Sequence, residues 1–337
     1  MELRKEPGHP PLPEESARNR DWCQNRPMSQ PPLIVLAGGS GFVGRHLAPA
    51  LVNAGYRVRI LTRDASRLRD LRVLPTLETA AHPGIYEPGT LGAAIRGASV
   101  VVNLVGILHQ GFRQESRFSW VHGLLTDRLL EAARAEAVPR FLHVSALRAE
   151  LPHPPSAYLR SKAEAEERIR RSGLDWYIVR PSVIYGPDDD FLKRFARLLQ
   201  WSPGILPLAC PKTPLAPVDI ADVVRVLRML IDGATVPAQA MNLEGYETLT
   251  LKAVVEAIAE TLHLRRLIVG LPDGASWLMG ALLQWMPHPP FTLDNYRSLR
   301  ALSCASAGSV ADGFSMLGIT PKPFRNRIPA YLESRGA

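Results

Sequence analysis

The chain has 337 residues, 46% hydrophobic and 21% charged, a composition typical of a globular protein with one large core or two smaller ones. Its formal net charge is +8, but the arginines are spread along the sequence and no aromatic residues alternate with them, which argues against a nucleic-acid-binding groove. Attraction to anionic ligands or to a phospholipid surface stays open.

Residues 1–30 are rich in Pro, Glu, Arg and Asn and have no apolar periodicity, which predicts a disordered tail without a signal peptide. Met28 is an alternative start of translation. The cysteines, Cys23, Cys210 and Cys304, lie far apart without a CxxC pair, so we expect neither disulfides nor a zinc site. We therefore expect a cytoplasmic protein, with peripheral contact to the cytoplasmic face of the inner membrane as an alternative.

The first predicted strand, residues 33–37, is followed by four glycines within seven residues. Gly38, Gly41 and Gly44 have the spacing in which one glycine makes a tight turn, one lets the backbone approach a pyrophosphate, and one packs a helix against the strand. A glycine-rich turn that binds nothing is the alternative. Unpaired amides at the start of the next helix would face the anion. The dinucleotide contacts predicted here are Gly38, Gly39, Ser40, Gly41, Phe42, Val43 and Gly44.

Apolar strands alternate with helical segments up to residue 187, which predicts an α/β fold with a Rossmann-type, doubly wound parallel sheet over residues 31–187. We expect the chain to return to this sheet around residues 218–245. Residues 188–330 are expected to form a smaller, mainly helical C-terminal lobe that carries the substrate site. The strands are predicted at residues 33–37, 57–61, 99–105, 141–145 and 176–180, and the later helices at 190–200, 218–231, 251–262 and 275–285.

A phenol and an ammonium, those of Tyr158 and Lys162, are spaced to share one face of a helix. Ser145 ends a predicted strand thirteen residues earlier, so its hydroxyl would lie near that of Tyr158 at the cofactor edge of the sheet. A phenol with a pKa near ~10 is a poor acid or base at neutral pH, and a nearby cation such as Lys162 would lower that pKa. We therefore predict Ser145, Tyr158 and Lys162 as catalytic residues.

Together with the glycine loop, this set resembles the short-chain dehydrogenase/reductase superfamily over most of residues 33–245. Residues 103–106 (Asn-Leu-Val-Gly) resemble the turn beneath the adenosine ribose, residues 180–187 the stretch beside the nicotinamide, and residues 218–223 the segment that closes the substrate lobe. More narrowly, residues 102–108, 158–162 and 180–187 resemble the atypical branch related to subunit nine of the complex I alpha subcomplex. The resemblance implies cofactor contacts at Asn103, Val105, Gly106, Tyr158, Lys162, Arg180, Pro181 and Val183.

Cofactor choice is expected to depend on the end of the second strand, Thr62-Arg63-Asp64. An arginine there accommodates the 2′-phosphate of NADP, whereas a carboxylate binds the ribose hydroxyl of NAD. We expect Thr62 and Arg63 to favour NADP. NAD is the alternative, because a strand end shifted by one residue would put Asp64 in that place.

Other candidates have simpler explanations. His109, His122 and His143 are expected at the surface or in the core, although His122 could point into the cleft. Residues 188–190 (Asp-Asp-Asp) look like a metal site but are expected to cap a helix, so we predict no metal. Residues 277–286 number about ten, well below the roughly 20 of a membrane-spanning helix. We expect them to pack in the core, with an apolar pocket or contact with lipid as alternatives.

Two functions compete. The first is an NADP(H)-dependent oxidoreductase or epimerase-type enzyme, in which Tyr158 moves a proton, Ser145 orients the substrate oxygen, and Lys162 tunes the phenol and holds the ribose. Its substrate would be a small molecule, hydrophobic or quinone-like, without excluding sugar nucleotides. The second is a non-catalytic dinucleotide-binding accessory or assembly protein of a respiratory membrane complex. We expect no nucleic-acid partner, and the oligomeric state is not predicted.

Overall fold

The computed structural model describes residues 31–106, 123–286, 289–303 and 311–332. The predicted tail, His109 and His122 lie outside these residues. The helices and strands of the sheet-forming part are β1 (Leu33–Ala37), α2 (Phe42–Asn53), β2 (Arg57–Thr62), η2 (Ala65–Leu71), β3 (Leu77–Ala81), α3 (Pro88–Ile95), β4 (Ala98–Asn103), α5 (Leu125–Ala135), β5 (Arg140–Val144), α6 (Ala157–Arg170), β6 (Asp175–Pro181), α8 (Ile220–Ile231) and β11 (Ala240–Leu243).

Seven strands form a sheet in the order β11-β6-β5-β4-β1-β2-β3, and every neighbouring pair is parallel. The strand order reverses at β1, where a doubly wound sheet opens a crevice at the carboxyl ends of its strands. The predicted Rossmann-type sheet is therefore confirmed. The half-exposed edge strand β3 and the added strand β11 lie outside the strands predicted from apolar runs.

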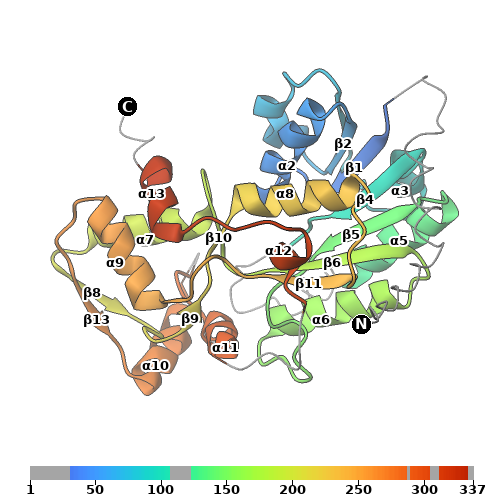
Figure 1. The fold of residues 1–337 in the computed structure, drawn as a ribbon. Coiled ribbons are helices and arrows are strands. Elements are labelled where there is room, and N and C mark those ends of the chain that lie inside the picture. Colours follow the sequence, from blue (N-terminus) through green and yellow to red (C-terminus); the bar gives the residue numbers. More distant parts are fainter. Residues whose placement is uncertain (1–30, 107–122, 287–288, 304–310, 333–337) are drawn as a thin grey trace, which may run out of the picture. The chain divides into compact units, whose positions relative to one another are not determined.

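Helices cover both faces of the sheet, as Figure 1 shows. One face packs against α2 and α8 through Ile34, Leu36 and their neighbours. The other packs against α3, α5 and α6 through Leu33, Val35 and theirs. Because alternate residues of a strand point to opposite faces, this two-sided burial explains why β1 is apolar throughout.

Most of the remaining elements build a second core that is helical with short paired strands, whereas Phe314 of α12 packs in the core of the large sheet. The pairs β7–β10, β9–β12 and β8–β13 are separate from the large sheet. Helices predicted at residues 190–200, 251–262 and 275–285 are present with small shifts. The elements are β7 (Ile184–Tyr185), α7 (Asp190–Trp201), β8 (Ile205–Leu208), β9 (Pro214–Leu215), β10 (Val218–Asp219), β12 (Leu249–Thr250), α9 (Leu251–Thr261), β13 (Leu267–Gly270), α10 (Asp273–Leu283), α11 (Leu293–Leu302), α12 (Gly313–Met316) and α13 (Phe324–Leu332).

The expectation that residues 277–286 pack in the core is wrong. Trp277 and Leu278 are each about half exposed, and Leu282, Trp285 and Met286 are exposed as well. The buried side of α10 consists of small residues instead, Ser276 and Gly280. Apolar composition alone could not show which side of this short helix faces the protein.

Candidate functional site

The glycine loop after β1 leaves room where a pyrophosphate would have to approach. A Cβ atom on Gly41 would meet only the carbonyl oxygen of Gly38, at 3.2 Å. A Cβ on Gly44 would lie 2.4 Å from the Cα of Gly39, so this glycine is required for helix α2 to pack against the loop. The two positions therefore fit the two roles expected for them: a single close neighbour at Gly41 and close helix packing at Gly44.

Helix α2 begins at Phe42 without a side-chain cap and without an acidic residue in its first turn. Its first amides and the positive end of its dipole are thus directed toward the exposed Gly41. The Phe42 ring packs edge-on against His46 and reaches Gly186, while Val43 packs on the core. The Ser40 carbonyl oxygen accepts a hydrogen bond from Arg45. The start of α2, with free amides and no acidic side chain, is therefore suited to an anionic dinucleotide.

The first glycine is packed against the turn that follows β4. Gly38 has φ of +80°, and a Cβ there would lie 2.9 Å from the Val105 nitrogen. Asn103 is buried and shapes this turn, because its Oδ1 accepts a hydrogen bond from the Val105 amide at 3.1 Å. Gly106 follows in an exposed position. The structure thus brings the glycine loop and the predicted residues 103–106 into contact.

Lys162 connects this turn to the end of β5. Its Nζ donates to the Val144 carbonyl oxygen at 3.0 Å and to that of Val105 at 3.4 Å. The side chain is buried, and burial lowers the pKa of Lys162 to about 8 against the opposing charge of Glu166. A single cation therefore lies between the carboxyl ends of two central strands, next to the glycine loop.

Tyr158 lies one turn before Lys162 on α6, as predicted. It is half-buried and packs with Ala146, Leu159 and Ala301. The expected lowering of its pKa by Lys162 is wrong for this structure, because burial raises the pKa of Tyr158 instead. The phenol therefore keeps its proton at neutral pH.

Ser145 directly follows β5 and donates its hydroxyl proton to Glu166 Oε1 at 2.6 Å. Toward any other group this hydroxyl can therefore act only as an acceptor. Whether it orients a substrate oxygen beside Tyr158 stays a prediction. Glu166 is a residue that the sequence reasoning missed, although it lies one helical turn after Lys162.

Glu166 forms a buried bidentate ion pair with Arg180 of β6, at 2.8 and 2.6 Å. Arg170 adds a third contact to the carboxylate at 2.7 Å. Burial raises the pKa of Glu166, but the hydrogen bonds and charge of Arg180, the hydrogen bond from Ser145 and the charge of Arg170 outweigh it and hold the pKa below its ordinary value. The guanidinium of Arg180 is thus engaged inside the protein, and a cofactor contact by Arg180 stays a prediction for its backbone.

Pro181 and Val183, the other predicted residues of this stretch, form hydrogen bonds within the protein through their backbones. The Pro181 carbonyl oxygen accepts a hydrogen bond from the Leu147 amide, and that of Val183 accepts one from Val218. The Val183 side chain packs on the core of the C-terminal lobe. These bonds hold the residues after β6 next to β10.

Strand β2 ends at Thr62, as the NADP prediction requires. The buried Thr62 hydroxyl donates to the Asp64 carbonyl oxygen, and Arg63 is exposed. Asp64 caps η2, and the hydrogen bond from Ser66 lowers the pKa of its carboxyl. One oxygen of the Asp64 carboxylate therefore accepts a hydrogen bond from the backbone.

Tyr86, which the sequence reasoning missed, closes the space beside this strand end. Its hydroxyl donates to the Leu61 carbonyl oxygen at 3.3 Å. Burial raises the pKa of Tyr86, whereas the Gly38 backbone and the charge of Arg63 act in the opposite direction. Tyr86 therefore lies between the glycine loop and the end of β2, and no local motif marks it.

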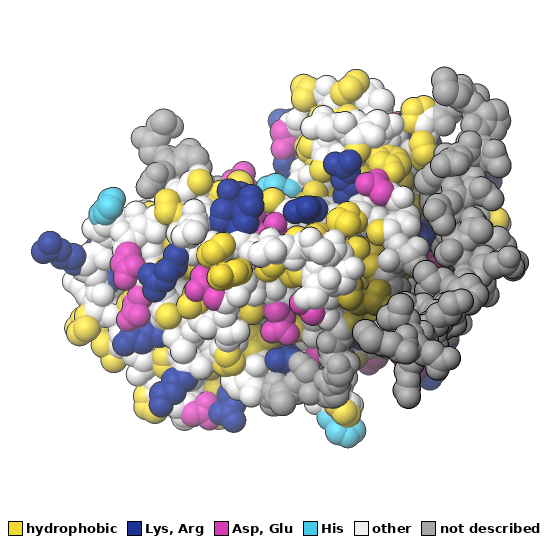
Figure 2. Space-filling view, viewed as in Figure 1, with side chains coloured by type: hydrophobic (Ala, Val, Ile, Leu, Met, Phe, Trp, Pro, Cys, Tyr) yellow, Lys and Arg dark blue, Asp and Glu magenta, His cyan; other side chains and the backbone are white. Residues whose placement is uncertain are grey.

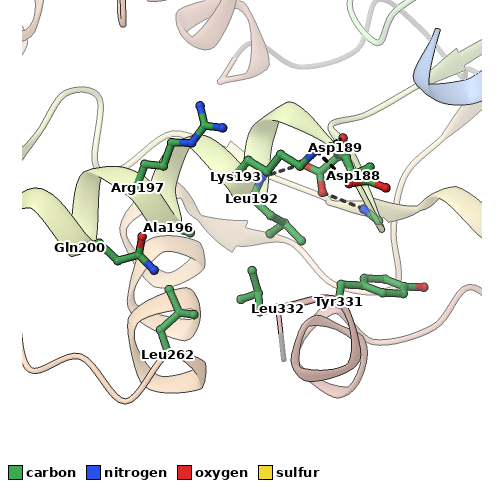
Figure 3. A pocket seen from close by; sticks show the side chains of 11 residues that line it. Asp188, Asp189, Leu192, Lys193, Ala196, Arg197, Gln200, Leu262, Tyr331 and Leu332 are labelled. Atoms are coloured by element: carbon green, nitrogen blue, oxygen red, sulfur yellow. Dashed lines mark hydrogen bonds and ion pairs between the residues drawn. The ribbon is translucent and has the colours of Figure 1, made fainter. Parts of the chain in front are cut away.

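A small cavity of about 180 Å³ lies between α7, α9 and α13 (Figure 3). Lys193 is directed toward Asp188 there, with Nζ and Oδ1 3.0 Å apart. Asp189 caps α7 by accepting from the Leu192 amide, as predicted. Among the described residues there is no group of three or more His, Cys, Asp or Glu suited to a metal ion. His143 is buried, in agreement with a core position.

A family model for NAD(P)H-binding proteins matches residues 38–193. The chain is 30% identical over 258 residues to a ceramide reductase of Caulobacter vibrioides, covering 74% of this chain and 77% of that protein. It is 28% identical over 300 residues to the mitochondrial NADH dehydrogenase (ubiquinone) 1 alpha subcomplex subunit 9 of Rattus norvegicus, covering 86% and 77%.

Among solved structures, WbmG of Bordetella bronchiseptica in complex with NAD has a TM-score of 0.69 at 17% identity, covering 92% of this chain and 96% of that one. This likeness concerns the fold. The range matched by the family model, residues 38–193, contains the glycine loop and the ends of β2, β4, β5 and β6. The chain belongs to the family of NAD(P)H-binding proteins that includes the ceramide reductase of Caulobacter vibrioides, and it is similar to subunit nine of the complex I alpha subcomplex.

Proposed function

We propose that this protein is an NADP(H)-dependent oxidoreductase that reduces a carbonyl group with the help of Tyr158, Lys162 and Ser145. The observation that carries the proposal is the placement of Lys162, a buried cation that bonds to Val144 and Val105 at two central strand ends. It lies one helical turn from a phenol that keeps its proton. Burying a cation costs stability, and titratable groups perturbed in this way cluster at functional sites.

Each residue has a role that follows from its chemistry. Bound NADPH supplies the hydride to the carbonyl carbon. Tyr158 donates its proton to the carbonyl oxygen as negative charge develops there, and the Lys162 ammonium would hold the nicotinamide ribose. Ser145, whose own proton is held by Glu166, accepts a hydrogen bond and helps to fix Tyr158 or the product hydroxyl. Tyr158 enters the reaction protonated, as the reductive direction requires.

Replacing Tyr158 by Phe tests the proposal, because only the hydroxyl is removed. We expect the variant to bind NADPH with unchanged affinity and to lose about 10²–10⁴-fold in kcat, the usual contribution of general acid catalysis. Unchanged turnover, or a cellular phenotype that the variant fully supports, would show that Tyr158 is not the acid.

NADP is favoured over NAD by the side chains after β2. Arg63 is exposed beside Tyr86, while the Asp64 carboxylate is held by Ser66. We expect Arg63→Gln to weaken NADPH binding about tenfold and to leave NADH binding unchanged, because a guanidinium bonds phosphate bidentately. Arg72→Gln, which removes an exposed charge from the same loop, is the matched control. Equal losses for both cofactors would refute this preference, and native mass spectrometry of the purified protein identifies the dinucleotide it carries.

A hydrophobic carbonyl compound is the substrate class that we propose. The relative from Caulobacter vibrioides is named a ceramide reductase, which supports a lipid-like substrate. NADPH consumption should be measured with long-chain ketones and with sugar nucleotides. Faster consumption with the ketones would support the hydrophobic class, and faster consumption with the sugar nucleotides would contradict it.

A second function is favoured by the similarity to subunit nine of the complex I alpha subcomplex. In that case the protein holds its dinucleotide without turnover and acts as an accessory of a respiratory membrane assembly. Cells carrying Tyr158→Phe would then retain respiration, whereas a variant that cannot bind dinucleotide would not.

A further inference from the structure

The exposed apolar side chains are concentrated on one part of the C-terminal lobe. Of the twelve large apolar side chains that are exposed in the described part of the chain, nine lie at the end of α7, on the β8–β13 pair, and along or just after α10. We call this region the α10 surface. Its apolar residues are Trp201, Ile205, Leu267, Val269, Trp277, Leu278, Leu282, Trp285 and Met286.

The β8–β13 pair contributes a flat apolar face. Its strands are parallel, with Leu267 opposite Ile205 and Val269 opposite Pro207, and all four residues are exposed. The alternating residues Leu206, Leu208 and Ile268 are buried in the lobe. Both faces of this pair are therefore apolar, although only one has a core to cover it.

Helix α10 continues the same surface. The amide of Cys210, just beyond β8, donates to Ser276 Oγ at 3.1 Å, which fixes α10 next to the strand pair. A Cβ on Gly280 would lie 3.2 Å from the Thr292 backbone, so the small-residue side of the helix faces α11. Trp277, Leu278 and Leu282 remain exposed.

The flanking charges are mainly positive. Residues 201–212 and 265–300 contain five basic residues, Lys212, Arg265, Arg266, Arg297 and Arg300, and two acidic ones, Asp273 and Asp294. Both acidic side chains have partners within the protein: Asp273 pairs with Arg300 at 2.7 Å, and Asp294 accepts from backbone amides at the start of α6. At the lower left of Figure 2, over β8, β13 and α10 of Figure 1, apolar and basic side chains lie close together with some acidic ones among them.

We propose that the α10 surface docks on a bilayer that contains anionic phospholipid. Tryptophan and leucine side chains enter the boundary between headgroups and acyl chains, where an indole keeps its N–H at the wet edge. The surrounding guanidinium and ammonium groups meet lipid phosphates. Charge favours an anionic membrane over an acidic or neutral protein partner, because basic residues outnumber acidic ones in the flanking segments and Asp273 is paired with Arg300. In the described ranges no helix is long and apolar enough to cross a membrane, so this contact is peripheral.

Cosedimentation of the full chain with vesicles tests the proposal. We expect binding to vesicles of phosphatidylcholine with phosphatidylglycerol, much weaker binding to phosphatidylcholine alone, and a decrease with added salt. The double variant Leu278→Glu/Leu282→Glu should bind the anionic vesicles at least about tenfold more weakly, because it puts two carboxylates into the contact. Arg265→Gln/Arg297→Gln should reduce binding to anionic vesicles only.

Val73→Glu is the matched control, since Val73 is 83% exposed but lies near η2 in the sheet-forming part. It should bind vesicles like the wild type. Circular dichroism melting and NADPH titration check that all variants are folded. Equal vesicle binding by wild type and Leu278→Glu/Leu282→Glu overturns the proposal, as does wild-type binding that is indifferent to lipid charge. Self-association without vesicle binding, lost in the double variant, would assign the surface to a second copy instead. Tyr158→Phe should dock normally, so failure of the proposed reaction and failure of docking are distinguishable.

Discussion

The two ends of the candidate cleft are built in opposite ways. At the phosphate end, Gly41 lacks a side chain and the uncapped start of α2 offers backbone amides. At the reaction end, Lys162, Glu166 and Arg180 bring three charged side chains into a buried position. A phosphate site needs only the absence of side chains, whereas buried charges must be matched to one another across different elements. Substitutions at the phosphate end should therefore lower stability only where packing is tight. Substitutions at the reaction end should lower it wherever a buried charge loses its partner.

Breaking the Glu166–Arg180 pair should have the largest effect on stability. Glu166→Gln removes the bidentate partner of the buried Arg180 guanidinium and leaves only the Glu150 carboxylate, 3.8 Å away, as a counter-ion. We expect the free energy of unfolding to fall by about 3 kcal/mol. Urea denaturation measures this loss. The control is Arg170→Gln, because Arg170 also contacts Glu166 but its side chain is 36% exposed. Removing such a partly exposed partner should cost about 1 kcal/mol or less. Equal losses in the two variants would mean that the buried Glu166–Arg180 pair stabilises the protein no more than the partly exposed Glu166–Arg170 contact.

Two glycines of the phosphate end should separate packing from binding. Gly44→Ala forces a Cβ to within 2.4 Å of Gly39, and such overpacking costs about 1–3 kcal/mol of stability. Gly41→Ala meets only the Gly38 carbonyl at 3.2 Å, so we expect nearly normal stability but weaker NADPH binding, by about tenfold. Thermal melting and NADPH titration of both variants check this. If Gly41→Ala bound NADPH like the wild type, the pyrophosphate would not approach at this residue.

The pH dependence of stability and of NADPH binding should show what the charge of Lys162 at the reaction end contributes to each. Burial lowers the pKa of Lys162 to about 8, from 10.5 as an ordinary value. Between these values the unfolded chain binds more protons, so the contribution of Lys162 to stability rises with pH. Its function runs the other way, because the ammonium is lost above about pH 8. We therefore expect NADPH binding to weaken by up to about tenfold from pH 7 to pH 9, in proportion to the fraction of Lys162 that stays protonated.

Lys162→Met is the control for this profile. It should weaken NADPH binding at pH 7 and remove the decrease between pH 7 and pH 9. A wild-type profile that is flat over this range would mean that the charge of Lys162 does not contribute to binding. A decrease that persists in Lys162→Met would assign it to another group.

The smallest effect should come from the contact that joins the C-terminal lobe to the reaction end. Asp294 of α11 accepts hydrogen bonds from the Ala157 and Tyr158 amides, at 2.6 and 3.3 Å. Ser156 caps the same helix through the Leu159 amide. Asp294→Ala should therefore cost about 1 kcal/mol, the usual value of a helix cap. Chemical denaturation measures it, with Asp273→Ala, an exposed partner of Arg300, as a control that should change stability less. Equal changes would mean that Asp294 is only a surface charge.

Short-range patterns predicted much of the fold. Strands such as β1 and β4 are buried on both faces and read as continuous apolar runs. The edge strand β3 escaped prediction, because Leu77–Ala81 is largely half-exposed and contains Glu78, which pairs with Arg57 and Arg59 of the neighbouring strand. The burial of such a strand depends on its neighbour, which local sequence does not contain.

The candidate site divides in the same way. Tyr158 and Lys162 share a helix face, and Gly38, Gly41 and Gly44 share a loop, so their spacing was sufficient. Glu166 was missed because its importance depends on Arg180 of another element, and Tyr86 because it reaches the glycine loop across the sheet edge.

The sequence by itself determined the alternation of strands and helices, the glycine loop and the helical spacing of phenol and ammonium, because each is a local property of the chain. Only the tertiary structure decided the pKa direction of Tyr158, the partner of Ser145, and the exposure of Trp277 and its neighbours on α10. These depend on which groups lose water on folding and on what lies opposite them, and distant segments of the chain fix both.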